Sequence, residues 1–92
     1  MENDARRLSR LIMSDMKLYN EQAVKEGCEQ RDLYSRLRED IDRARAIYDK
    51  RIDRWLVNRD YFHEEMVAVL CGGNEKALGA EYPGPPPRPF TN

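Results

Sequence analysis

The sequence predicts a small all-α protein, and three observations support this prediction. No proline occurs before Pro83, and Gly27 is the only glycine before Gly72, so the long first part of the chain contains few helix breakers. Apolar residues recur at spacings of three and four, which is the period of one helix face. No segment alternates apolar and polar residues over the length of a strand.

The first expected helix begins near Ala5. Its apolar stripe is spaced by 3, 4, 4, 3 and 4 residues and consists of Ala5, Leu8, Ile12, Met16, Tyr19 and Ala23. The stripe passes through Asn20 in phase, yet Asn20 is also able to cap a new helix at Glu21, and both alternatives stay open. Gly27 is expected to end this segment, and Asp32 is expected to cap the next one.

The second expected helix runs from about Leu33 to about Val57. Its stripe is spaced by 4, 4, 3, 4, 4 and 3 residues and consists of Leu33, Leu37, Ile41, Ala44, Tyr48, Ile52 and Trp55. The same phase, if continued, would place Arg59 and His63 in the apolar seam. A break at residues 58–60 is therefore favoured over one continuous helix.

Asp60 is the expected cap of a short third helix, which ends at Gly72 and Gly73. Its apolar side consists of Phe62, Met66, Val69 and Leu70. The expected domain is thus residues 1–72, with two longer antiparallel helices and a short third one. Residues 73–92 are expected to form a flexible Gly/Pro-rich tail, because proline fixes φ and lacks an N–H donor.

Apolar residues outside the two main stripes predict self-association. They are Leu11, Met13, Leu18, Tyr34, Ile47 and Leu56. A chain of this length buries roughly 60% of its unfolded surface, so a bundle completed by a homodimer or a partner is favoured over a monomeric three-helix bundle. One sequence does not distinguish a core residue from an interface residue. The residues expected in one or the other are Leu8, Ile12, Met16, Tyr19, Leu37, Ile41, Tyr48 and Trp55.

Two stretches of the chain resemble a known type of sequence. One is ARRLSRLIMSDMKLYN at residues 5–20, followed by Val24, Gly27 and Asp32; the other is DYFHEEM at residues 60–66, leading into LCGG at residues 70–73. Together they resemble an uncharacterised helical region of small bacterial proteins, which sometimes lies beside a zinc ribbon or another regulatory module. The resemblance implies a bacterial, cytoplasmic, helical module and no particular chemistry.

The sequence contains one candidate metal site, but a structural role for its two residues is favoured over metal binding. Asp60 and His63, the only histidine, lie one turn apart on one helix face, a spacing that suits a single metal ion. A dimer would supply a second such unit by symmetry, as in a ferritin-like bundle. An exposed histidine near a helix start, with Asp60 as the cap, is the favoured interpretation, so no metal or other cofactor is expected.

A nucleic-acid interface is weighed in the same way. Arg6, Arg7, Arg10 and Lys17 give the first helix a modest basic stripe. The whole chain, however, has 16 basic and 17 acidic residues and a net charge of −1, so no overall electrostatic field attracts nucleic acid. A solvated face is favoured, and a nucleic-acid-associated regulatory protein stays an alternative.

The cysteines and the other sequence motifs suggest no catalytic activity. Cys28 and Cys71 are far apart in the chain and are expected to be free thiols, with a disulfide left open. No nucleophile–histidine pair or phosphate-binding glycine loop occurs, so no enzyme activity is expected. The polar, acidic start favours a cytoplasmic location. The sequence thus predicts a non-catalytic oligomerisation or partner-binding module.

Overall fold

The computed structural model describes residues 2–53, 56–57 and 59–84, and within them the chain is all-α, as predicted. The α-helices are α1 (Glu2–Tyr19), α2 (Glu21–Gln30), α3 (Leu33–Arg36), α4 (Arg38–Arg51) and α5 (Tyr61–Glu65). A π-helix, η1 (Met66–Leu70), continues α5, and a 3₁₀-helix, η2 (Glu75–Leu78), follows. The described residues thus form five α-helices, and the expected count of three was wrong.

The first expected helix is divided at Asn20. The side-chain Nδ2 of Asn20 donates to the carbonyl oxygen of Met16 at 2.8 Å, which satisfies a free carbonyl at the end of α1. Asn20 makes no side-chain cap to α2, so it ends one helix without capping the next. The in-phase apolar stripe did not reveal this break, because a bend between two helices can keep the same residues on the inner side.

Gly27 lies inside α2 and does not end it, contrary to the prediction. A β-carbon at this position would lie 2.8 Å from Cα of Leu33, so glycine is required for the close approach of α2 and α3. The helix instead ends at Arg31, which takes the left-handed conformation with φ of 57°. The N–H of Asp32 then donates to the carbonyl of Gly27 at 3.0 Å.

The second expected helix is also divided and is shorter than predicted. Leu37, with φ of −114°, separates α3 from α4. α4 ends at Arg51, and Ile52 is extended. The predicted cap at Asp60 is confirmed, since its side chain accepts a hydrogen bond from the N–H of His63 at 3.3 Å.

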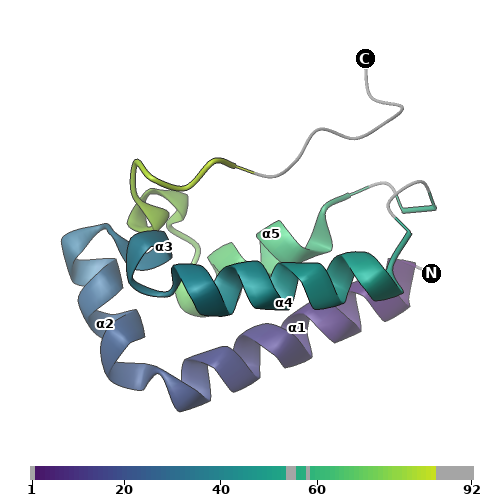
Figure 1. The fold of residues 1–92 in the computed structure, drawn as a ribbon, viewed down its shortest axis with the longest axis horizontal. Coiled ribbons are helices and arrows are strands. Elements are labelled where there is room, and N and C mark those ends of the chain that lie inside the picture. Colours follow the sequence, from purple (N-terminus) through teal and green to yellow (C-terminus); the bar gives the residue numbers. More distant parts are fainter. Residues whose placement is uncertain (1, 54–55, 58, 85–92) are drawn as a thin grey trace.

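The core lies between α1, α4, α5 and η1, with α2, α3 and η2 packed together at one end. α1 forms the lower edge of the molecule in Figure 1, and α4 runs above it in the opposite direction. The largest fully buried side chains include Tyr48, Phe62, Met13, Leu33 and Met66. One copy of the chain therefore encloses an interior of its own.

Part of the segment assigned to the tail belongs to this interior. Ala77 and Leu78 of η2 are 2% and 1% exposed. At Gly79, φ is 90° and a β-carbon would lie 2.4 Å from the carbonyl oxygen of Arg31, so the segment passes directly over the α2–α3 connection. The compact unit thus extends beyond residue 72, and residues 85–92 of the expected tail lie outside the described residues.

Candidate protein-interaction surface

The inner side of α1 is formed by different residues from those predicted. Ala5, Ser9 and Met13 are 0% exposed and Met16 is 8% exposed. The hydroxyl of Ser9 donates to the carbonyl of Ala5 at 2.8 Å, so this polar group is satisfied inside its own helix. Two small residues one turn apart allow α1 to approach α5 and η1, against which it packs.

The predicted contact residues of α1 are therefore divided. Met16 is in the core, Leu8 and Ile12 are half-buried at its margin, and Tyr19 is 80% exposed. On the second expected helix, the structure places Leu37, Ile41 and Tyr48 in the core, at 5%, 2% and 2% exposure. Trp55 lies outside the described residues.

A second stripe on α1 lies opposite the buried one. It consists of Asp4, Arg7, Leu11, Asp15 and Leu18, spaced by 3, 4, 4 and 3 residues. All five side chains are exposed, with Leu11 at 59% and Leu18 at 61%. We call these five residues the outer α1 face.

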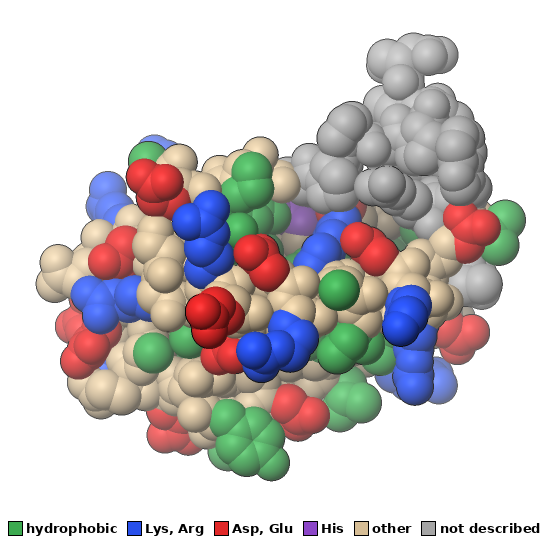
Figure 2. All heavy atoms as spheres, viewed as in Figure 1, with side chains coloured by type: hydrophobic (Ala, Val, Ile, Leu, Met, Phe, Trp, Pro, Cys, Tyr) green, Lys and Arg blue, Asp and Glu red, His purple; other side chains and the backbone are tan. Residues whose placement is uncertain are grey.

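Leu11 and Leu18 of the outer α1 face are the only two exposed large apolar side chains that share one face of a helix among the described residues. The other exposed large apolar side chains are Tyr19 at the end of α1, Ile47 on α4 and Leu56. In Figure 2, acidic and basic side chains are mixed over α4, and the lower edge, where α1 lies in Figure 1, shows hydrophobic side chains together with acidic ones. An exposed helix face with paired leucines one heptad apart is a candidate protein contact.

Two of the four cations considered for nucleic-acid binding form ion pairs with one acidic residue, Glu65. Glu65 has a side chain only 6% exposed, and it accepts from Arg6 Nη1 at 3.1 Å and from Arg10 Nε at 3.2 Å. Arg6 also lies over the ring of Tyr61 at 4.7 Å. These contacts join α1 to α5, so two of the four candidate cations serve the fold.

Arg7 and Lys17, the other two candidates, are exposed, and neither forms an ion pair with any part of the chain that the structure describes. They are ten residues apart on α1. Arg7 lies on the outer α1 face, whereas Lys17 lies toward α2. The structure therefore does not bring the four cations together into one open basic surface.

The side chains of Asp60 and His63, the two candidate metal ligands, contact different residues. Both carboxylate oxygens of Asp60 accept from Arg45, at 2.8 Å each. His63 places Nδ1 2.7 Å from the Tyr82 hydroxyl and Nε2 3.2 Å from Glu75. Within the described ranges, no group of three or more His, Cys, Asp or Glu side chains is arranged to hold a metal ion.

Tyr82 attaches the segment after η2 to the helices. Its ring lies nearly parallel to that of His63, with an interplanar angle of 9°, and meets Tyr34 edge-on at 5.3 Å. Burial raises the pKa of Tyr82, which keeps its hydroxyl protonated and available to His63. Tyr34 in turn donates to Asp42 at 2.8 Å. These contacts are those of a structural polar cluster that holds residues 75–82 in place.

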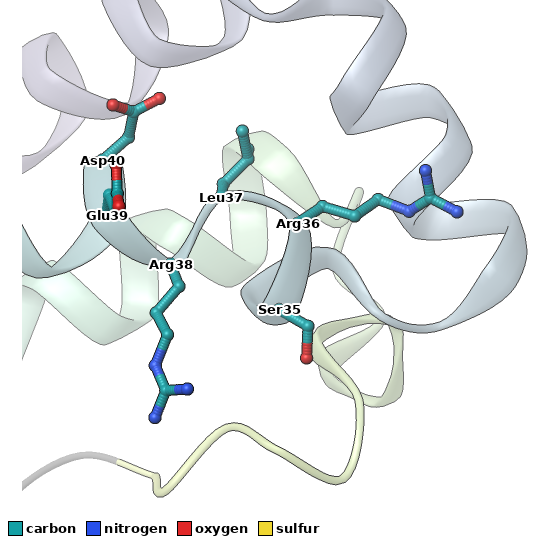
Figure 3. A pocket seen from close by; sticks show the side chains of 6 residues that line it. All are labelled: Ser35, Arg36, Leu37, Arg38, Glu39 and Asp40. Carbon is teal, nitrogen blue, oxygen red and sulfur yellow. The ribbon is translucent and has the colours of Figure 1, made fainter.

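A shallow pocket of about 400 Å³ lies at the α3–α4 break, lined by Ser35, Arg36, Leu37, Arg38, Glu39 and Asp40. In Figure 3, Arg36 and Arg38 point away from each other, and Asp40 points to the opposite side from Arg38. Arg36 is already paired with Asp32 at 2.6 Å. The polar groups do not converge on a common point, so the pocket lacks the arrangement that ligand binding or catalysis requires.

The two cysteines lie near each other at a separate groove of about 540 Å³. Both are free thiols, and the Cys28 thiol donates to the carbonyl of Leu70, the residue before Cys71, at 3.1 Å. Burial raises the pKa of Cys71 to about 12 and also raises that of Cys28. Raised pKa values disfavour the thiolate form of both side chains.

The structure adds one statement about membranes. No helix in residues 2–53, 56–57 and 59–84 combines the length and the apolar character that crossing a bilayer requires.

Comparison of the chain with family models, with curated proteins and with solved structures gave no match in any of the three. The geometry of the chain itself is therefore the basis for a functional proposal.

Proposed function

We propose that this chain is a non-catalytic helical module that associates with protein, and that the outer α1 face is its contact surface. The observation that carries the proposal is the exposure of Leu11 and Leu18, at 59% and 61%, on a helix whose other side is fully packed. α1 is therefore held rigidly by the core while it presents two leucines to solvent. A rigid, pre-formed apolar stripe loses little conformational entropy when it binds.

The location of the core changes the reason for expecting association, although association is still expected. Leu37, Ile41 and Tyr48 are covered by the same copy of the chain, so association is not needed to complete the interior. What stays uncovered is the outer α1 face. On the resemblance noted above, the module would belong to a bacterial cytoplasmic complex.

The two alternative functions receive less support. A nucleic-acid interface would use Arg6 and Arg10, whose charges are directed to the buried Glu65. A metal-binding dimer would use Asp60 and His63, which are engaged by Arg45, Tyr82 and Glu75. The metal site would require its contacts to break first, and the nucleic-acid interface would have only Arg7 and Lys17 without an ion pair to the described residues.

The test compares two leucines of equal exposure. Leu18 on the outer α1 face and Leu56 outside it are both 61% exposed, so Leu18→Asp and Leu56→Asp change solubility and charge alike. Both variants, with the wild type, are studied by light scattering over a concentration series and by affinity capture from the native host. Loss of self-association or of captured proteins in Leu18→Asp alone would support the proposal. Identical behaviour of all three proteins would contradict it.

A further inference from the structure

The outer α1 face has a symmetry that bears on the identity of its partner. Its five positions, 4, 7, 11, 15 and 18, are symmetric about Leu11. Arg7 and Asp15 lie four residues on either side, about 6 Å along the helix axis at 1.5 Å per residue. Around Leu11 the face thus carries one positive and one negative charge at equal distances, and its two outer positions are Asp4 and Leu18.

We propose that the outer α1 face binds a second copy of this chain, with the two α1 helices antiparallel and a two-fold axis at Leu11. This inference rests on the proposed function and names its partner. A two-fold axis at Leu11 brings Arg7 of each copy level with Asp15 of the other, and Leu11 against Leu11. Two identical ion pairs then flank a leucine contact, so the centre of the surface is complementary to itself. At the ends of the contact, Leu18 of each copy lies level with Asp4 of the other, and that carboxylate stays in contact with solvent.

Charge also decides between the two orientations. In a parallel pair, each residue would face its own equivalent, which places Arg7 against Arg7 and Asp15 against Asp15. Like charges in register are unfavourable, whereas the antiparallel arrangement converts both contacts into attractions. The four side chains are free to do this, because neither Arg7 nor Asp15 forms an ion pair with the described part of its own chain.

The position of α1 allows a second helix to approach. α1 forms one edge of the molecule over its whole length, from Glu2 to Tyr19, and the outer face is turned away from the core. The contact is one helix pair of about 27 Å length, which is small for a protein interface. We therefore expect a dimer in reversible, concentration-dependent equilibrium with the monomer.

The experiment is a charge-swap cycle on the full chain. The variants are Arg7→Glu, Asp15→Arg and the double variant, and sedimentation velocity over a concentration series gives the dimer dissociation constant. Each single reversal places like charges together at two symmetric sites and should raise the dissociation constant about tenfold. The double variant restores opposite charges and should return it to within about threefold of the wild type.

A matched control and the contrary outcomes separate this inference from the proposed function. Lys17→Glu makes the same charge change as Arg7→Glu on the same helix but outside the face, and should leave the dissociation constant unchanged. Circular dichroism verifies that all variants fold. Single reversals without effect, or a double variant that is not restored, overturn the antiparallel arrangement. A wild type that is monomeric at all concentrations overturns the second copy as the partner, while Leu18-dependent capture of another protein would still support the proposed function.

Discussion

The guanidinium group of Arg45 binds the carboxylate of Asp60 through two parallel hydrogen bonds, both 2.8 Å long. The same carboxylate caps α5 by accepting from the N–H of His63. Arg45 comes from α4, and both side chains are mostly buried, at 20% and 15% exposure. A single bidentate contact therefore both begins α5 and sets its position against α4.

Asp60→Asn should destabilise the fold by about 2 kcal/mol, because the buried guanidinium of Arg45 loses its bidentate charged partner and keeps only the longer contact with Asp49 at 3.5 Å. Asparagine is itself a good N-cap, so the hydrogen bond to His63 can persist and the variant isolates the ion pair. The free energy of unfolding from urea denaturation measures the effect. Arg43→Ala is the control: Arg43 is 70% exposed and 3.5 Å from Asp40, and its loss should cost less than about 0.5 kcal/mol.

Glu65→Ala should destabilise the fold by about 1 kcal/mol, since it removes the carboxylate that Arg6 and Arg10 share. Glu65 is 6% exposed, but Arg6 and Arg10 are 39% and 63% exposed, so water can solvate the two cations and high salt should reduce part of the loss. Urea denaturation at low and high salt tests both statements. Arg6→Ala should reproduce part of the loss, whereas Arg7→Ala, one residue away on the exposed side, should leave the stability unchanged.

The sequence predicted the features that depend on local chemistry. Helix period and the lack of early prolines give the all-α class, and Asp60 is a cap because a short carboxylate reaches the N–H three residues on. The stripe of Leu37, Ile41 and Tyr48 marks buried positions for the same reason, since one helix face must be covered.

The features that depend on contacts between distant segments were missed. The predicted stripe of the first helix does not include Ser9, although a serine that bonds to its own helix behaves as a small core residue. Gly27 resembled a helix end, but its role is to admit Leu33, which no local pattern reveals. Glu65 did leave a signal: it lies three residues after Phe62 on the apolar side of its helix, where a carboxylate requires a cation from elsewhere.

Gly27→Ala tests the close approach of α2 and α3, and its expected effect on stability is opposite to the effect that helix propensity predicts. Alanine favours helix over glycine by about 1 kcal/mol, so local propensity predicts stabilisation. The new β-carbon would lie 2.8 Å from Cα and 2.9 Å from Cδ1 of Leu33, so we expect a net loss of about 1–3 kcal/mol instead. Thermal unfolding of this variant, with Lys25→Ala on the exposed side of α2 as the control, measures the difference. A melting temperature above that of the wild type would contradict the α2–α3 contact.

The two thiols should differ in reactivity in the folded protein. Burial raises the pKa of Cys71 to about 12, so at pH 8 it carries roughly a thousandfold less thiolate than an ordinary cysteine. Cys28 is half-buried and should be alkylated first, although burial raises its pKa as well. Iodoacetamide labelling followed by peptide mass spectrometry measures both rates, with the urea-unfolded chain as the reference. Equal labelling of the two cysteines before unfolding would show that Cys71 is not enclosed.

Tyr48→Phe should leave the stability at neutral pH unchanged or raise it by up to about 1 kcal/mol. The Tyr48 hydroxyl is buried and has no well-formed hydrogen bond within the described residues; the backbone of Tyr61 acts on it only weakly, so removing the hydroxyl costs little. Burial also raises the pKa of Tyr48 from 10 to about 12 in the folded state. The unfolded chain therefore loses this proton at a lower pH than the folded chain does.

That difference predicts a loss of stability in alkali. The stabilisation from a protonated Tyr48 is complete below pH 10 and is lost as the pH rises toward 12, because ionisation then favours the unfolded state. Urea denaturation at pH 8, 10 and 11 should show a smaller decline for Tyr48→Phe than for the wild type. Some decline should persist, since burial raises the pKa of Tyr34 and Tyr82 too. Tyr19→Phe, at a position 80% exposed, should follow the wild type at every pH, and an equal decline in all three proteins would rule out Tyr48 as a source of the effect.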